Sequence, residues 1–186
     1  MPKQELINIW TTQEKNYVNG YGCRFVLWVQ GCHLVCDGCW NEHTWDFDKK
    51  NLVSIDDMFI KITSVDGLDG VTFTGGEPFI QAKSLVKLAQ RIKTELNLSI
   101  QIFTGFELHE LNKKYQKELL SLVDVLVAGR FDSSKPDNNQ KVYQLSDEQW
   151  QFNNSDVEIE VGRGGGIILT GYPKERFIES IKEIVK

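Results

Sequence analysis

The stretch that decides the fold is Cys32-His33-Leu34-Val35-Cys36-Asp37-Gly38-Cys39. Three of the four cysteines of the chain stand in it, separated by three residues and then by two. Three thiolates on one short loop can bind three irons of a cubic [4Fe–4S] cluster. The loop offers no fourth cysteine, so one iron is left for an outside ligand. The spacing therefore predicts a cluster with one open iron.

A structural zinc site is the main alternative for these cysteines. Cys3His is a common zinc set, with His33 or a distant residue as the fourth ligand. However, His33 directly follows Cys32, and adjacent side chains rarely reach one tetrahedral ion together. Zinc sites usually pair a Cys-x2-4-Cys motif with a second pair, and the chain has no second pair. Buried inert thiols or disulfides would not need this clustering. The spacing favours the cluster and leaves zinc open.

The composition is that of one globular domain. The 186 residues are 41% hydrophobic and 25% charged, which is ordinary for a folded protein. No apolar run approaches the length of a membrane span, and Met1-Pro2-Lys3-Gln4-Glu5 does not resemble a secretory signal. The net charge of −5 gives no basic surface for nucleic acid. Clustered cysteines indicate a reducing compartment, so we expect a cytoplasmic protein without a nucleic-acid or membrane partner.

The apolar pattern predicts strands that alternate with helices. Strands are expected at 6–10 (a short edge strand), 24–30, 70–74, 99–104, 123–128, 157–161 and 166–170. Helices are expected after the N-cap Ser54 and at 80–96, 107–122 and 174–185. This alternation is typical of an α/β fold with a mainly parallel sheet. There are too few units for eight βα repeats, so we expect an open, partial (β/α) barrel.

A second motif, Thr74-Gly75-Gly76-Glu77-Pro78, follows the strand at 70–74. Its two glycines permit positive φ and a close approach of backbone to a ligand. Glu77 adds an acceptor at the same strand end as the cysteine loop, where α/β folds build sites. Taken alone, the motif slightly favours an ordinary strand-to-helix turn that carries a solvated acid.

Together the two motifs resemble the radical S-adenosylmethionine (SAM) superfamily. The resemblance implies a [4Fe–4S] cluster on Cys32, Cys36 and Cys39, with the open iron chelated by the amino and carboxylate groups of SAM. It also implies that 75–78 (Gly75, Gly76, Glu77 and Pro78) bind the SAM amino group. One electron from the cluster then cleaves SAM and releases a 5′-deoxyadenosyl radical.

Four further blocks resemble the activating enzymes of glycyl radical enzymes, in particular those of anaerobic (class III) ribonucleotide reductase. They are residues 18–24, 39–46, 103–111 and 124–131. The resemblance implies that Trp40 packs beside the cluster or adenine, that Asn41 lies near SAM, and that Thr104 and Gly105 line the SAM pocket. It implies a glycyl radical enzyme as the protein substrate, and an electron donor such as flavodoxin or ferredoxin.

The C-terminal part departs from that subfamily. We expect a single domain over 1–186 with its core at about 17–131, and a divergent part at about 132–186. Within that part, Arg163 is a candidate for the SAM carboxylate because a guanidinium binds carboxylates bidentately. The divergence keeps two other functions open: a radical SAM maturase that modifies a peptide, protein or small molecule, and a non-catalytic metal-binding scaffold.

Other distinctive residues have plainer interpretations. We expect Cys23 to be a buried strand thiol. His33 and His43 are expected to face solvent or to hydrogen-bond near the cluster. The expected core or interface residues are Trp10, Trp28, Trp45 and Trp150.

Overall fold

The computed structural model describes residues 5–132, 134–147, 157–161 and 167–171. The strands are β1 (Leu6–Asn16), β2 (Arg24–Val29), β3 (Asn51–Ser54), β4 (Gly70–Gly75), β5 (Ser99–Thr104), β6 (Val125–Ala128), β7 (Lys141–Gln144), β8 (Val157–Val161) and β9 (Ile167–Gly171). The α-helices are α1 (Ile55–Thr63), α2 (Ala82–Arg91) and α3 (Lys114–Leu120). Short helical turns are η1 (Glu42–Thr44), η2 (Pro78–Gln81), η3 (Ile92–Leu96), η4 (Leu108–Glu110) and η5 (Pro136–Asn139).

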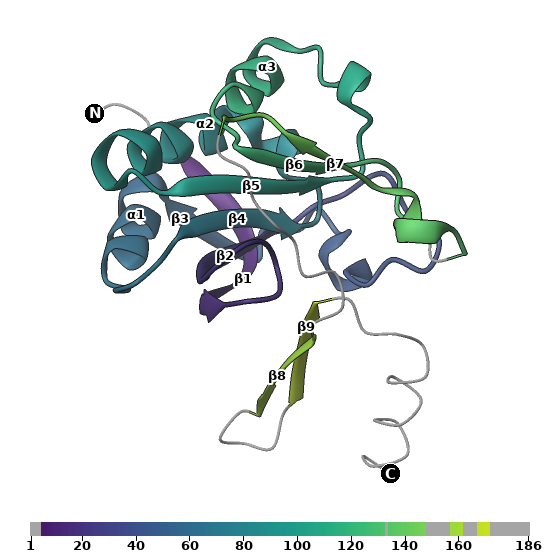
Figure 1. Cartoon of the computed structure of the whole chain (residues 1–186), viewed down its shortest axis with the longest axis horizontal. Coiled ribbons are helices and arrows are strands. Elements are labelled where there is room, and N and C mark those ends of the chain that lie inside the picture. The colour runs from purple at the N-terminus through teal and green to yellow at the C-terminus, as the bar shows by residue number, and fades with distance from the viewer. Residues whose placement is uncertain (1–4, 133, 148–156, 162–166, 172–186) are drawn as a thin grey trace.

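One sheet of seven strands organises the described part of the chain, in the order β3-β1-β2-β4-β5-β6-β7 (Figure 1). The central strands β2, β4, β5 and β6 are parallel, and β1, β3 and β7 pair antiparallel. The order begins at β3 and ends at β7, so the sheet is open. The α/β class and the open, mixed sheet with a parallel centre are therefore confirmed. β8 and β9 form a separate antiparallel hairpin.

The first strand differs from its prediction. β1 has eleven residues and lies inside the sheet, between β2 and β3, whereas the sequence predicted a short edge strand. The side chain of Asn8 explains the difference, because its Nδ2 donates to the Asp48 carbonyl and its Oδ1 accepts from the Lys50 amide. These bonds draw the chain back beside β1, where the four-residue β3 pairs with it.

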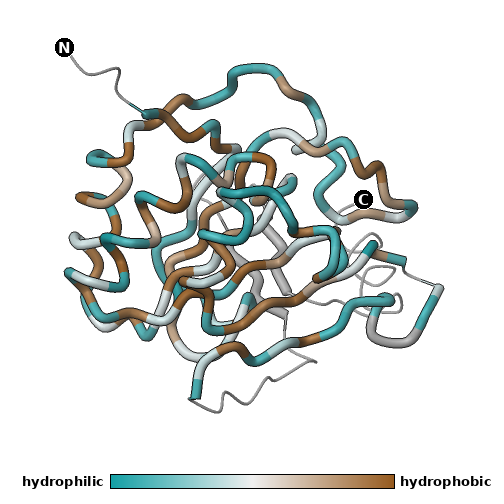
Figure 2. The backbone as a smooth tube through the Cα atoms, turned by 90° about the horizontal axis from the view of Figure 1, so that it is seen from above, coloured by the Kyte–Doolittle hydropathy of each residue, from teal (hydrophilic) through white to brown (hydrophobic). Residues whose placement is uncertain are grey.

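The two faces of the sheet differ in polarity. On one face the apolar side chains of the central strands, such as Leu27, Phe73 and Ile102, are fully buried in the main core, which also includes helix residues. In Figure 2 hydrophobic segments recur along the strands and helices of this core. On the other face, alternate positions of the strands carry buried polar side chains, among them Thr72 and Gln101. This second face is the inner side of the partial barrel.

Arg24 fixes the amino end of β2. Its side chain is 2% exposed, and its guanidinium makes five hydrogen bonds. The acceptors are the Thr72 and Ser99 hydroxyls and the carbonyls of Tyr21, Val71 and Ser99. Burial lowers the pKa of Arg24 to about 10. The bonds join β2, β4, β5 and the turn before β2 at one point.

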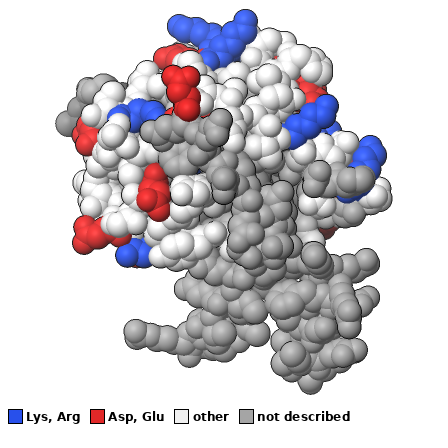
Figure 3. Space-filling model, in the orientation of Figure 1, with Lys and Arg blue, Asp and Glu red and all other residues white. Residues whose placement is uncertain are grey.

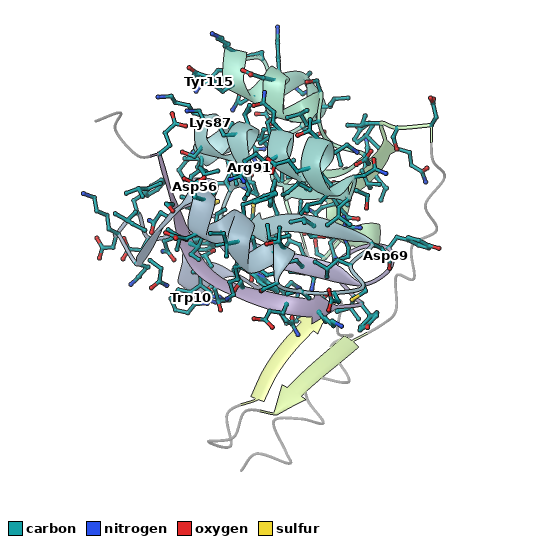
Figure 4. The ribbon with its side chains drawn as sticks, turned by 90° about the vertical axis from the view of Figure 1, so that its left-hand side faces the viewer. Trp10, Asp56, Asp69, Lys87, Arg91 and Tyr115 are labelled. Atoms are coloured by element: carbon teal, nitrogen blue, oxygen red, sulfur yellow. The ribbon has the colours of Figure 1, made fainter. Side chains whose placement is uncertain are left out.

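The helix predicted after Ser54 is confirmed as α1. Ser54 caps α1, since its Oγ accepts from the Asp57 amide at 3.0 Å. On the outside, Arg91 of α2 pairs with Asp56 of α1 at 2.9 Å, and its guanidinium lies 3.7 Å from the centre of the Phe59 ring. Figure 4 shows Asp56 and Arg91 on the outer surface of these two helices. The predicted helix 80–96 is divided into η2, α2 and η3.

The predicted helix 107–122 is wrong in its first half. Only η4 and α3 are helical, and Leu111 between them has a non-helical ψ of 63°. The Glu110 carboxylate accepts from the Glu107 amide and also pairs with Arg130, so it closes a short turn instead of continuing the helix. β7 was not predicted, and the predicted helix 174–185 lies outside the described residues.

Candidate active site

The loops after the four parallel strands meet at one end of the sheet. Val29 of β2 pairs with Gly75 of β4, and Thr104 of β5 pairs with Ala128 of β6, so these strands end at nearly the same level. A cavity of about 270 Å3 opens there. The residues singled out from the sequence that line it are Cys32, Cys36, Cys39, Trp40, Asn41, Gly75, Gly76, Glu77, Thr104 and Gly105.

The cysteine loop is held at its start by the segment that follows it. The Gly31 amide donates to the Thr44 carbonyl at 2.7 Å, and the Cys32 amide donates to the Trp45 carbonyl at 3.0 Å. Beyond Cys32 the loop turns tightly, and Val35 has a positive φ of 47°. This is an uncommon conformation for a β-branched residue and is often found at functional sites. Val35 is 60% exposed, so it forms the tip of the loop.

All three loop cysteines are free thiols of intermediate exposure. Burial raises the pKa of Cys32 and of Cys39 above the ordinary value. A bound metal reverses this effect, because a coordinating thiol is deprotonated. Cys39 Sγ also accepts a hydrogen bond from the Asn41 amide at 3.4 Å. Hydrogen bonds of this kind to ligand sulfur help to set the reduction potential of an iron–sulfur cluster.

The donor set fits a cluster. Among the described residues, no three His, Cys, Asp or Glu side chains lie close enough to bind a single metal ion. A tetrahedral zinc site needs ligands that converge on one point. In a [4Fe–4S] cluster each thiolate binds a different iron, so three thiols around one cavity suffice. The cavity wall offers Cys32, Cys36 and Cys39 in this way.

Gly75 and Gly76 pack the end of β4 against the start of the cysteine loop. Gly75 has φ +95°, and a Cβ added there would lie 2.8 Å from the backbone of Trp28 and Val29. At Gly76 a Cβ would lie 2.9 Å from the Gly31 carbonyl carbon and closer still to its oxygen. The Gly76 amide donates to the Val29 carbonyl at 2.8 Å. These glycines are thus required by the fold itself as well as by any ligand beside them.

Glu77 is almost fully buried, with 1% of its surface exposed. Its Oε1 accepts from the Phe79 amide at 2.9 Å and from the Thr104 hydroxyl at 2.8 Å, and its Oε2 accepts from the Gly105 amide at 2.9 Å. Burial raises the pKa of Glu77 to about 7, although these donors act in the opposite direction. The sequence predicted a solvated or ligand-binding acid here. In the structure, the carboxylate accepts hydrogen bonds from three groups of its own chain.

Arg130 contacts the loop after β5 from the side opposite Glu77. Its guanidinium donates to the Gly105 carbonyl and makes two bonds to the Glu110 carboxylate, at 2.9 and 3.0 Å. The pairing lowers the pKa of Glu110 below its ordinary value. No lysine or arginine belongs to the described cavity wall. Arg163, predicted for the SAM carboxylate, lies outside the described residues.

The segment after Cys39 forms one side of the cavity. Trp40 is 47% exposed at the cavity wall. The Asn41 carbonyl accepts from the Thr44 amide at 2.8 Å and from its hydroxyl at 2.6 Å, and this closes the turn η1. Pro78 does not line the cavity in the described structure; it is buried as the first residue of η2.

Several lining residues were not predicted from the sequence to bind the cluster or SAM. They are Asn19, Trp28, Leu34, His43, Trp45, Thr74, Phe103, Phe131 and Gln140. Some signal existed, because Asn19, Phe103 and Phe131 stand in the blocks at 18–24, 103–111 and 124–131. Trp28 and Trp45 were expected only in the core or an interface. His33 and His43 are exposed as expected, with the His43 ring 4.9 Å from that of Trp10. Cys23 is buried and away from the cavity.

The fold and this cavity define a radical SAM enzyme with a [4Fe–4S] cluster. Residues 18–151 match the family model described as "4Fe-4S single cluster domain", and the chain belongs to that family.

Its relatives carry a more particular name. The chain is 30% identical to the "anaerobic ribonucleoside-triphosphate reductase-activating protein" of Enterobacteria phage T4, over 76% of this chain and 90% of that protein. The proteins of the same name from Haemophilus influenzae and Escherichia coli K12 are each 34% identical. The match covers 64% of this chain and 81% of the first, and 61% of this chain and 78% of the second. Among solved structures, QueE from Escherichia coli is similar with a TM-score of 0.41 and 25% identity, over 56% of this chain and 53% of that one.

Two further observations concern surface charge and helix length. On the face drawn in Figure 3, positive and negative side chains of the described residues are interspersed. In the part of the chain that the structure describes, no helix is long and apolar enough to span a membrane.

Proposed function

We propose that this protein generates a glycyl radical on an anaerobic ribonucleoside-triphosphate reductase. One observation carries the proposal: three free thiols and the Gly75–Gly76 turn converge on one cavity at the carboxyl ends of the parallel strands. The relatives named for this activation match over most of their length. The reductase in their name is the partner that we propose for this protein.

In the proposal, Cys32, Cys36 and Cys39 bind the cluster, and SAM lies between the cysteine loop and the backbone of Gly75, Gly76 and Thr104–Gly105. A cluster held there would supply one electron for the cleavage of SAM to methionine and a 5′-deoxyadenosyl radical, and this radical would take a hydrogen atom from a glycine Cα. The chain positions these groups and keeps water away from them. Aromatic walls serve this purpose, among them Trp28 and Phe103.

The open sheet supports a macromolecular substrate. β3 and β7 are the two ends of the sheet order, so the sheet does not close around the cavity. Exposed apolar side chains, Val35 and Trp40, stand beside it. A glycine on a partner protein can approach from this side. The electron comes, in the proposal, from a one-electron donor protein such as flavodoxin or ferredoxin.

The first experiment tests SAM cleavage. The protein is reconstituted anaerobically with iron and sulfide, reduced with dithionite in the presence of SAM, and 5′-deoxyadenosine is measured by chromatography. We expect deoxyadenosine from the wild type and none from Cys36→Ala. Cys23→Ala is the matched control, because Cys23 is also a free thiol but lies outside the cavity. It should retain iron and cleavage. A Cys36→Ala protein that still cleaves SAM would contradict the assigned ligands.

The second experiment tests the partner. The reduced protein is mixed with SAM and an anaerobic ribonucleoside-triphosphate reductase, and the radical is recorded by electron paramagnetic resonance. We expect a glycyl radical signal that depends on SAM and disappears when the radical-bearing glycine is replaced by alanine. SAM cleavage without a radical on the cognate reductase would point to another substrate, as in the maturase alternative.

A further inference from the structure

The carboxylate of Glu77 is occupied by donors of its own chain. It accepts the Phe79 amide, the Thr104 hydroxyl and the Gly105 amide, all at 2.8–2.9 Å. A carboxylate offers about four acceptor positions, and three are filled here. With 1% of the residue exposed, the oxygens present almost no surface to a ligand.

These bonds connect three loops of the proposed site. Glu77 belongs to the loop after β4, and Thr104 and Gly105 stand at the end of β5. Gly105 in turn touches the cysteine loop, because a Cβ added there would collide with the side chain of Leu34. On its other side the Gly105 carbonyl accepts from Arg130, which follows β6. The position of Gly105 is therefore set by Glu77 and Arg130 together.

The inference rests on the proposed function. We propose that Glu77 is a positioning residue: it fixes Gly105, and through it Leu34 of the cysteine loop, and it makes no bond to the SAM amino group. The Glu77 amide also donates to the Gly31 carbonyl at 2.9 Å, next to Cys32. The residue thus ties the first half of the cysteine loop, at Gly31 and Leu34, to β4 and β5.

An acid suits this position better than an amide does. All three partners of the side chain are donors, and a carboxylate only accepts. In Glu77→Gln the amide NH2 must face a backbone N–H, either that of Phe79 or that of Gly105. One buried donor then loses its partner, which is costly. The conservative variant therefore tests the contacts without changing the side-chain size.

The decisive measurement compares two ligands. Binding of SAM, and of its analogue in which hydrogen replaces the amino group, is measured by calorimetry on reconstituted wild type and Glu77→Gln. For a positioning role, Glu77→Gln weakens both ligands by about tenfold or more. The penalty for removing the amino group then stays the same in both proteins, within twofold. If Glu77 bonded to the amino group, that penalty would shrink at least tenfold in the variant, and the proposal would be overturned.

A second measurement needs no ligand. A double-mutant cycle of Glu77→Gln and Thr104→Val is read by urea unfolding of the protein without cluster or SAM, with Thr104→Ser as the variant that keeps the hydroxyl. We expect Thr104→Val to cost clearly less when Glu77 is already replaced, and Thr104→Ser to lie nearer the wild type. Additive effects would overturn the network. If Glu77→Gln does not fold, Thr104→Val replaces it in the ligand comparison, with the same expected result.

The control for the chemical change is Glu95→Gln. Glu95 is an exposed carboxylate on η3 that pairs with Arg91, outside the cavity. It should leave both ligand affinities unchanged. A wild type that binds neither ligand would refute the proposed function, while the unfolding cycle would still report on the network.

Discussion

Replacing Gly76 by alanine should displace the backbone at the start of the cysteine loop and destabilise the protein. The new Cβ would lie 2.9 Å from the Gly31 carbonyl carbon, and real Cβ atoms essentially never approach other atoms more closely than 3.0 Å. Gly31 is poorly able to move, because its amide donates to Thr44 at 2.7 Å and its carbonyl accepts from Glu77 at 2.9 Å. Relief of the clash must therefore stretch two hydrogen bonds beside Cys32.

The size of the effect follows from these contacts. Overpacking costs about 1–3 kcal/mol, and two weakened hydrogen bonds add about 1 kcal/mol each. Alanine also lowers the conformational entropy of the unfolded chain, which offsets less than about 1 kcal/mol of this loss. We expect Gly76→Ala to lose about 2–5 kcal/mol of unfolding free energy, and to bind less iron per chain.

The assay is anaerobic urea unfolding of the cluster-free protein, followed by circular dichroism, with iron analysis after reconstitution. Gly67→Ala is the control: its φ is +76°, but a Cβ there meets nothing within 4 Å. The control pays only for the left-handed backbone, about 1 kcal/mol. A Gly76→Ala protein that is as stable as Gly67→Ala and takes up full iron would refute the reasoning.

Three further predictions concern stability. Ser54→Ala should cost about 1 kcal/mol because α1 loses its N-cap, measured as a lower urea midpoint; Ser54→Asp should restore most of it. Arg24→Lys should cost about 2–4 kcal/mol in thermal unfolding, since lysine has three donors for five acceptor contacts, and an unchanged melting temperature would contradict this. Glu77 has a pKa of about 7 when folded and 4.5 as its ordinary value, so its contribution to stability is present at low pH and lost as pH rises through 7. Between pH 5 and 8, cluster-free wild type should lose about 2–3 kcal/mol relative to Glu77→Gln, and parallel profiles would speak against the raised pKa.

The sequence predicted the parallel centre of the sheet well. The strands at 24–30, 70–74 and 99–104 are dense in β-branched and aromatic residues, and buried strands need that composition. It predicted β1 poorly, because the place of a strand in a sheet depends on its neighbours. Here the neighbour β3 is a four-residue segment held by the side chain of Asn8. No local sequence pattern predicts this contact.

The candidate site was predicted by its motifs and missed in its contacts. Spacing placed Cys32, Cys36 and Cys39 on one loop, and strand order placed Gly75 beside them. The burial of Glu77 could not be foreseen, because its donors Thr104 and Gly105 stand some 28 residues away in the sequence. In the same way, the pairing of Glu110 with Arg130 broke a helix that the local pattern favoured.

The Arg24 cluster has a consequence for how this protein can be altered. Arg24 begins β2 and Val29 ends it, so the two ends of the strand are about 17 Å apart. The hydrogen bonds of Arg24 stabilise the fold at the amino end of the strand, and the cavity of the candidate site lies at its carboxyl end. Substitutions of Arg24 should therefore change mainly how many molecules stay folded in a cell, whereas substitutions of its partner Thr72 also reach the cavity wall, because the Thr72 hydroxyl donates to the Asn19 carbonyl at 2.8 Å. Engineering for heat resistance should therefore begin at Arg24 and the amino ends of the strands, and should leave Asn19 of the cavity wall unchanged.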